Sequence, residues 1–212
     1  MSEPLVLYVE ASWTSPWVCS VFVALREKAL PFSTAIAMMR IGTGAIDVMH
    51  DRSLTGTAPV LQHGSFWIAE SLAIVEYLDE IFPDHSMLPA NVRDRARARQ
   101  LMIWMRQDHG ALREARPAER IFYGWGTIAP LSGAARTCAD ELLRVADRLG
   151  ADERGHIFER FGIEDVELAF ALNRLISSGE PVSEALRAYV ATVWARPSMR
   201  EFIQHVRPPN PP

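Results

Sequence analysis

Short apolar runs alternate with amphipathic stretches over the first third of the chain. Residues 5–9 form a run rich in β-formers, which predicts a strand. A helix is predicted from Pro16, because proline lacks an N–H and suits the first turn, and it should end before Pro31. Its apolar side chains recur at helical spacing: Val18, Val21, Phe22 and Leu25.

The next segments complete an α/β domain. Residues 32–37 predict a second strand, and residues 42–54 an irregular or weakly helical connection. Residues 59–68, with a turn at 63–64, predict a hairpin, and the segment from Glu70 predicts an amphipathic helix. The order is β-α-β-α-β-β-α, with the second helix weakly indicated. A parallel pair needs a crossover and a hairpin is antiparallel, so we expect a mixed sheet.

Beyond Pro83 only helical patterns remain. We expect an N-terminal domain over residues 1–82, a proline-containing linker over 83–90 and an all-helical domain over 91–212. The predicted helices cover residues 93–116, 132–149, 165–176, 183–195 and 198–205. Ser132 is expected to cap the start of the second helix and Gly150 to end it. The proline-rich tail from Arg207 cannot be helical and is expected to be a frayed extended end.

Composition narrows the function classes. The 212 residues carry 22 basic and 26 acidic side chains, a formal charge of 22 − 26 = −4, which disfavours a nucleic-acid partner. Two cysteines are too few for a disulfide scaffold, no apolar run approaches the ~20 residues of a membrane span, and the N-terminus lacks a signal pattern. We therefore expect a cytoplasmic protein without a membrane partner.

Several chemistries lack their motifs. No two histidines have metal-ligand spacing, no cysteine sits in a CxxC, and nucleophile-elbow, Walker and dinucleotide fingerprints are absent, so we expect no metal site. Arginines at 93, 95, 97 and 99 predict a solvated face or a subunit contact rather than a polyanion groove. Lys28 is the only lysine, so a carboxylate ligand would have to be met by Arg or His.

Four short motifs occur in a distinctive order: Ser15-Pro16, Thr57-Ala58-Pro59-Val60-Leu61, Glu70-Ser71 and Gly162-Ile163-Glu164-Asp165. With the domain order, they make nearly the whole chain resemble the cytosolic glutathione transferase superfamily, and most closely its bacterial serine-type members. The resemblance implies a thioredoxin-like first domain and glutathione as co-substrate. It also implies a cytoplasmic homodimer that acts on small electrophiles or hydroperoxides, in detoxification or oxidative stress.

The resemblance also implies a glutathione site. A cis Pro59 would expose the N–H and C=O of Ala58 to the cysteinyl backbone, while Glu70 and Ser71 would bind the γ-glutamyl end. The alternatives are an ordinary loop proline and simple helix capping by Ser71. The glycyl carboxylate would meet one of three cations: Arg40, His50 and Arg52.

The resemblance implies that Ser15 is the catalytic residue, because the family's catalytic serine directly precedes such a proline. A hydroxyl at a helix N-terminus would favour a thiolate. The alternatives are a plain N-cap, or catalysis by Ser12, Thr14 or a backbone N–H. Cys19, one turn on, is a rival nucleophile for a disulfide reductase, although buried helix cysteines are usually inert. A third hypothesis, besides the transferase and the disulfide reductase, is a non-catalytic binding or stress protein that kept the fold.

Two further expectations remain. The electrophile pocket is expected between the two domains, where aromatic and methionine side chains suit an apolar electrophile. Its candidate residues, each of which could instead belong to the core or to a subunit contact, are Trp17 on the first helix, Met105, Asp108, Leu112 and Tyr123. Gly162 stands where the family usually has Ser or Thr, yet Asp165 can still bond back to the Gly162 N–H. That bond concerns folding of the helical domain and not its chemistry.

Overall fold

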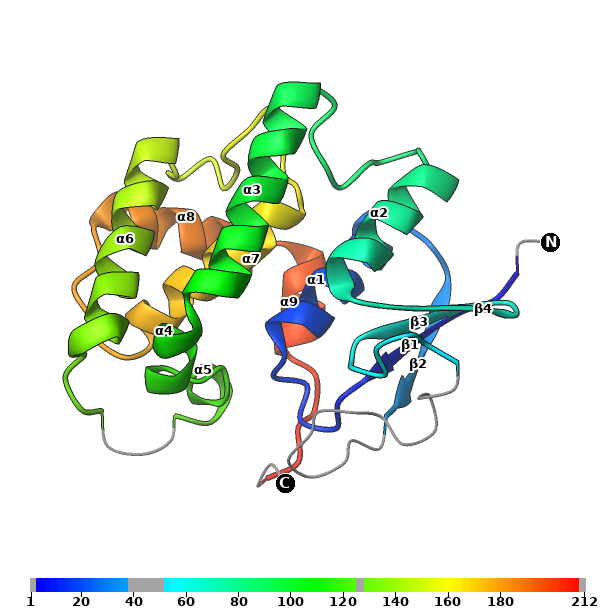
Figure 1. Ribbon diagram of the computed structural model, residues 1–212, viewed down its shortest axis with the longest axis horizontal. Helices are drawn as coiled ribbons and strands as arrows, with labels where there is room; N and C mark the ends of the chain where they lie inside the picture. The colour runs from blue at the N-terminus through cyan, green and yellow to red at the C-terminus, as the bar shows by residue number, and fades with distance from the viewer. Residues whose placement is uncertain (1–2, 38–51, 125–127, 210–212) are drawn as a thin grey trace. The chain divides into compact units, whose positions relative to one another are not determined.

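The structure is a computed structural model that describes residues 3–37, 52–124 and 128–209 (Figure 1). The chain forms two compact units. The sheet unit contains Met1–Met87 together with Glu201–Pro212, and the helical unit contains Leu88–Arg200. Each unit is described by itself below.

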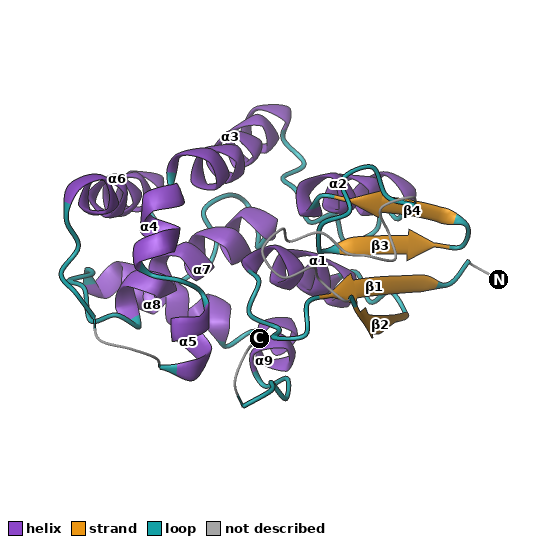
Figure 2. Cartoon of the chain, turned by 60° about the horizontal axis from the view of Figure 1, so that its bottom comes forward, coloured by secondary structure: helices purple, strands orange, loops and turns teal. Residues whose placement is uncertain are grey.

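The described residues of the sheet unit form four strands (Figure 2). They are β1 (Leu5–Val9), β2 (Phe32–Ile36), β3 (Val60–His63) and β4 (Phe66–Ala69). Their order is β2-β1-β3-β4, with β1 parallel to β2 and antiparallel to β3, and β3 antiparallel to β4. The expected mixed sheet is therefore confirmed. The connection predicted over residues 42–54 lies largely outside the described residues.

Two helices pack together in this unit, α1 (Pro16–Glu27) and α2 (Ser71–Ile81). The only lysine, Lys28 at the end of α1, links the two helices, because its buried Nζ lies 2.8 Å from Oδ1 of Asp79 on α2. Lys28 also donates to the carbonyls of Asp84 and His85, 3.3 and 3.4 Å away, just after α2. This ammonium is thus committed to the fold.

The helical unit contains α3 (Val92–Asp108), α4 (Gly110–Ala115), α5 (Glu119–Tyr123), α6 (Gly133–Leu149), α7 (Ile163–Ile176) and α8 (Glu184–Trp194). Helix α9 (Pro197–Ile203) contributes residues to both units. One prediction was wrong here, and one helix was missed. The single helix over 93–116 is interrupted at His109, whose φ of −95° and ψ of 25° leave the helical region, and α5 was not predicted.

The N-terminus of α7 is closed by a buried carboxylate. Asp165 Oδ2 accepts from the Gly162 N–H at 2.9 Å, which confirms the predicted back-bond. The other oxygen, Oδ1, accepts from the Ile157 N–H at 2.9 Å and from the Tyr189 hydroxyl at 2.8 Å. One side chain therefore ties α7 to α8 and to the loop before it.

The last predicted helix, over 198–205, ends earlier, at Ile203, and residues 207–209 are non-helical, as predicted. The expectation that Arg207 is frayed was wrong, whereas residues 210–212 lie outside the described residues. The Arg207 guanidinium donates to four backbone carbonyls, those of Trp13, Phe202, Ile203 and His205, at 2.6–3.0 Å. Four such bonds hold Arg207 firmly in the sheet unit.

Candidate functional site

Strand register brings three predicted motifs to one edge of the sheet. Val60 lies opposite Ala69 and also opposite Tyr8, so the start of β3 adjoins the end of β4 and the end of β1. The residues just outside these ends are Ala58-Pro59, Glu70-Ser71 and the loop from Glu10 to Ser15. Sequence motifs up to 56 positions apart (71 − 15) are thereby gathered at one place.

Ser15 caps helix α1. Its backbone is extended, and its Oγ accepts from the Val18 N–H at 3.3 Å. The first N–H groups of a helix lack helical partners and carry a positive dipole end, so an anion is favoured here. Ser15 is half-buried, and its hydroxyl proton is not used in the cap, because the cap needs only the oxygen.

The other hydroxyls of this loop are engaged differently. Ser12 Oγ and Thr14 Oγ1 lie 3.0 Å apart and bond to each other, and Thr14 is buried. Cys19 is fully buried, with 0% of its surface exposed. Among the candidate nucleophile activators, Ser15 is the one at the helix terminus.

A buried carboxylate underlies the Ser15 loop, and sequence reasoning missed it. Glu10 Oε1 accepts from the Thr14 N–H at 2.7 Å and the Ser15 N–H at 2.6 Å. Glu10 is 9% exposed, and burial raises its pKa, an effect opposed by these N–H donors and by the charge of Arg207. A polar residue directly after an apolar strand was the available sequence signal.

The Ala58–Pro59 peptide is cis, as the resemblance implied. Glu70, rather than Ser71, is the N-cap of α2, so capping by Ser71 was wrong. Glu70 has a φ of 70°, unusual for a residue with a side chain, and its Oε1 accepts from Thr57 Oγ1 at 3.3 Å. Ser71 is the buried first residue of α2.

Of the three candidate cations, Arg52 alone lies among the described residues, since Arg40 and His50 fall in the segment that is left out. Arg52 is exposed, and its guanidinium carbon lies 5.3 Å from the centre of the Trp67 ring. Such a stacked guanidinium keeps its N–H donors available to a carboxylate.

The five candidate pocket residues are divided between the units. Trp17 lies on α1 in the sheet unit, and Met105, Asp108, Leu112 and Tyr123 lie in the helical unit. Met105 and Leu112 are buried, Tyr123 is half-buried and Asp108 is exposed. Their role in binding an electrophile stays a prediction.

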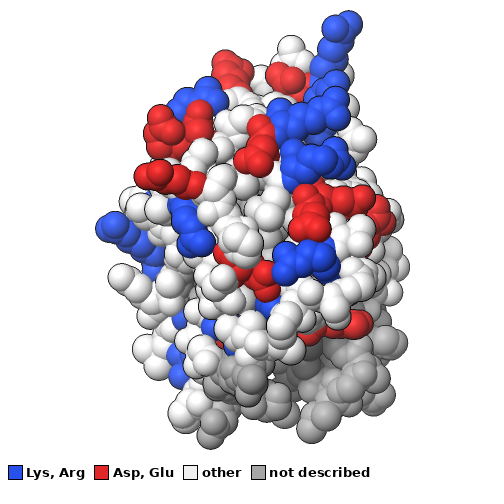
Figure 3. All heavy atoms as spheres, turned by 90° about the vertical axis from the view of Figure 1, so that its left-hand side faces the viewer, with Lys and Arg blue, Asp and Glu red and all other residues white. Residues whose placement is uncertain are grey.

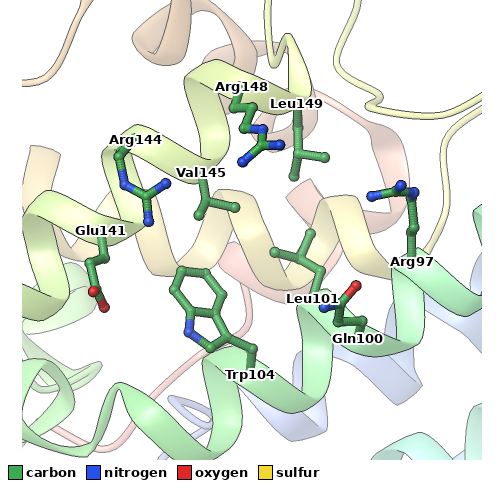
Figure 4. A pocket seen from close by; sticks show the side chains of 9 residues that line it. All are labelled: Arg97, Gln100, Leu101, Trp104, Glu141, Arg144, Val145, Arg148 and Leu149. Atoms are coloured by element: carbon green, nitrogen blue, oxygen red, sulfur yellow. The ribbon is translucent and has the colours of Figure 1, made fainter.

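A groove between α3 and α6 was not anticipated (Figure 4). It has a volume of about 540 Å³, and Leu101, Trp104, Val145 and Leu149 form its apolar lining. Three arginines surround this lining, Arg97 on α3 and Arg144 and Arg148 on α6. Within the described ranges, no carboxylate pairs with these three guanidiniums, although acidic and basic side chains are interspersed on the face seen in Figure 3.

Two negative findings apply to residues 3–37, 52–124 and 128–209. No helix in these ranges is both long enough and apolar enough to cross a bilayer. No group of three or more His, Cys, Asp and Glu side chains there is arranged to hold a metal ion.

The fold and the site define a thioredoxin-like domain followed by a helical domain. Family models for glutathione S-transferases match both parts, the N-terminal domain over residues 11–86 and the C-terminal domain over residues 91–206. The chain therefore belongs to the glutathione S-transferase family.

Individual relatives agree over most of the chain. A glutathione transferase homologue from Burkholderia (strain BGR1), solved with bound glutathione, is 36% identical, with a TM-score of 0.75 over 95% of this chain and 97% of that one. A glutathione S-transferase from Rhodospirillum rubrum F11 is 25% identical, with a TM-score of 0.72 over 98% and 96% of the two chains. The stringent starvation protein A homologue of Pasteurella multocida is 27% identical over 90% of this chain and 86% of that protein.

Proposed function

We propose that this chain is a serine-type glutathione transferase in which the Ser15 hydroxyl stabilises the glutathione thiolate. The observation that carries the proposal is the place of Ser15, which caps α1 at the sheet edge where Ala58 and Glu70 also lie. The Burkholderia homologue, whose structure contains glutathione, supports this ligand.

Each part of glutathione has a suitable group at this edge. The Ala58 backbone would pair with the cysteinyl residue as an added strand does. The Glu70 carboxylate would bind the γ-glutamyl ammonium, and the Ser71 N–H and hydroxyl its carboxylate. Arg52 would meet the glycyl carboxylate.

The chemistry needs a thiolate at neutral pH. A cysteine-type thiol has a pKa of roughly 8.5, so only a few per cent is ionised. A hydrogen bond from Ser15 and the α1 dipole would together lower that pKa by about two. This corresponds to roughly 2.7 kcal/mol of stabilisation of the thiolate relative to the thiol. The sulfur then attacks an electrophilic carbon, forming a C–S bond as the leaving group departs with its electron pair.

A hydroperoxide is consumed by the same thiolate. Attack on the peroxide oxygen forms an S–O bond, breaks the O–O bond and gives a sulfenic acid and an alkoxide, which takes a proton from water to become the alcohol. A second glutathione then converts the sulfenic acid to a disulfide and water. Conjugation of a chloronitroaromatic and reduction of cumene hydroperoxide therefore test the two reactions separately.

The deciding experiment is Ser15→Ala, with Ser183→Ala as its matched control. Ser183 also caps a helix, accepting from the Leu186 N–H at 3.4 Å, so its loss reports capping alone. We expect Ser15→Ala to raise the pKa of bound glutathione, read from ultraviolet thiolate absorbance, and to lower kcat about tenfold to a hundredfold. An unchanged thiol pKa would transfer the role to Ser12, Thr14 or a backbone N–H.

Two other functions are separable from this one. A disulfide reductase would reduce a glutathionyl disulfide, and burial of Cys19 favours glutathione itself as the nucleophile in that case. A non-catalytic stress protein is favoured by the similarity to stringent starvation protein A homologues over 90% of the chain. Failure to bind glutathione in calorimetry, with the fold intact, would favour that reading.

The protein is further proposed to work as a cytoplasmic homodimer. Support comes from the groove between α3 and α6, whose apolar lining and three arginines suit an acidic surface of a second copy. No carboxylate in the described part of the chain pairs with these arginines. In this interface Arg97 and its charge run on α3 would form a subunit contact, which is one of the two alternatives that the sequence left open for these arginines.

A further inference from the structure

We propose that the chain after α9 is a positioning element of the glutathione site, and that Arg207 and Glu10 together hold the loop that carries Ser15. The proposal rests on the proposed function for its catalytic consequence. Its structural half stands independently, because all of these residues belong to the sheet unit.

The loop from Glu10 to Ser15 needs to be held, because its backbone is unusual. Trp13 has a φ of 51°, a left-handed conformation that side chains other than glycine disfavour. Such a residue persists only where its surroundings over-determine it. The loop between β1 and α1 is also short, so an error at Trp13 would displace Ser15 two residues later.

Contacts from the C-terminal chain fix Trp13. Arg207 Nε donates to the Trp13 carbonyl at 3.0 Å, and the His205 ring stacks on the Trp13 indole with centroids 3.7 Å apart. Phe202 packs against the same indole, with centroids 5.7 Å apart. The other guanidinium nitrogens bond to carbonyls of residues 202–205, so Arg207 is itself rigid.

Glu10 holds the loop from the other side. Its Oε1 accepts from the N–H groups of Thr14 and Ser15, while its Oε2 is buried without a hydrogen-bond partner among the described residues. A buried carboxylate needs compensating charge, and the positive charge of Arg207 opposes the rise that burial causes in the pKa of Glu10. The two residues, 197 positions apart (207 − 10), thus converge on one turn.

The consequence is that Ser15 is placed by groups that do not touch glutathione. The Ser15 N–H is fixed by Glu10, and the peptide two residues earlier is fixed by Arg207, which leaves the hydroxyl free to turn toward sulfur. A hydrogen bond to a thiolate depends strongly on distance and angle. A loosened loop should therefore reduce the stabilisation of the thiolate by Ser15 more than it reduces the affinity for glutathione.

The test uses Arg207→Gln in the full-length protein, with Val206→Ser as the matched control. Val206 is 89% exposed and precedes Arg207 in the same segment. We expect Arg207→Gln to raise the pKa of bound glutathione and to lower kcat about three- to tenfold, with KM for glutathione nearly unchanged. Val206→Ser should match wild type, and an Arg207→Gln protein with the wild-type thiol pKa would overturn the proposal.

Two Glu10 variants separate positioning from charge. Glu10→Gln keeps a carbonyl oxygen for both N–H groups and should retain kcat within about threefold, whereas Glu10→Ala removes the acceptor and should lower kcat at least tenfold. Equal losses in both variants would contradict the positioning role of Glu10.

Hydrogen–deuterium exchange of the peptide covering residues 10–15 gives a readout that needs no glutathione. Arg207→Gln should speed exchange there and leave the α7 peptide unchanged. Unchanged exchange in residues 10–15 would overturn the proposal even if Ser15 is catalytic. Faster exchange without any glutathione binding would instead refute the proposed function and leave the loop-holding role intact.

Discussion

Glu70 shows how a single backbone conformation can serve a site. Its φ of 70° and ψ of 109° lie outside the regions that residues with a Cβ prefer, and conformations of this kind cost about 1–3 kcal/mol. The side chain is exposed and forms no cap to α2. The backbone carbonyl of Glu70 accepts from the Ile74 N–H at 2.9 Å, as an N-cap carbonyl does, but its side chain makes no capping hydrogen bond. A strained residue whose side chain does not cap the helix is consistent with a ligand-binding carboxylate.

Substituting Glu70 by glycine should therefore separate folding from binding. We expect Glu70→Gly to raise the free energy of unfolding by about 1 kcal/mol, because glycine adopts a positive φ without a steric penalty. The same change should weaken glutathione binding at least tenfold, because the ammonium loses its carboxylate. Urea denaturation and calorimetry measure the two effects.

Glu70→Gln is the matched variant. It keeps the side-chain volume and the backbone strain but removes the charge, so it should weaken glutathione binding without the gain in stability. If Glu70→Gly binds glutathione as tightly as wild type does, the γ-glutamyl end is recognised elsewhere.

Residue-level prediction from sequence depends on motifs. Ser15, Pro59 and Glu70 each stand in a short recognisable pattern, the cis bond before Pro59 is confirmed, and the structure brings the three residues to one edge of the sheet. The glutathione contacts assigned to them stay predictions. Glu10 was missed because a polar residue directly after a strand is only a weak signal. Arg207 was missed because its bond to the Trp13 carbonyl is a contact between the two ends of the chain. No local spacing reports such a contact.

At the scale of elements, α7 depends on the carboxylate of Asp165. The group is fully buried, and burial raises its pKa from 3.8 to about 6, against the lowering effect of its bonds from Gly162, Tyr189 and Ile157. Because the folded pKa exceeds the unfolded one, the folded state binds the proton more tightly. The stability that this proton provides is present below about pH 4 and is lost as pH rises toward 6.

The resulting prediction is a pH dependence that Asp165→Asn removes. A shift from 3.8 to about 6 corresponds to about 3 kcal/mol lost between pH 4 and pH 6.5 in wild type. Asp165→Asn should show a flatter profile, although it is less stable overall because its amide cannot accept every bond. Urea denaturation at several pH values tests this, with the exposed Asp140→Asn as control. Parallel profiles for wild type and Asp165→Asn would contradict it.

Element boundaries were predictable where end signals were explicit. Pro16 and Gly150 mark the start of α1 and the end of α6 as expected, and the latter has the left-handed φ of 69° that glycine permits. The break at His109 was missed because the apolar spacing continues through it. The short helix α5 was missed because five residues are too few for a periodic pattern.

At the scale of the whole molecule, the choice of partner depends more on how the charges are distributed over the surface than on the net charge. The net charge of −4 disfavours a polyanion partner, yet three arginines surround one groove on the helical unit, and none of them pairs with a carboxylate among the residues that the structure describes. The ammonium of the single lysine, Lys28, is buried and paired with Asp79, so it is not available to a partner. An acidic protein with a local basic groove is electrostatically suited to associate with a copy of itself.

Charge reversal in the groove should therefore dissociate the proposed homodimer. The double change Arg144→Glu and Arg148→Glu would place like charges against an acidic partner surface, and we expect sedimentation to shift from dimer to monomer at micromolar concentration. Arg200→Glu is the control, because Arg200 is exposed and lies outside the groove. It adds negative charge without touching the interface, so it should remain dimeric. Since the groove contributes no group to the glutathione site, the monomeric variant should bind glutathione with wild-type affinity. A double variant that stays dimeric would locate the interface on another surface, and added salt should weaken the wild-type dimer if the arginines hold it.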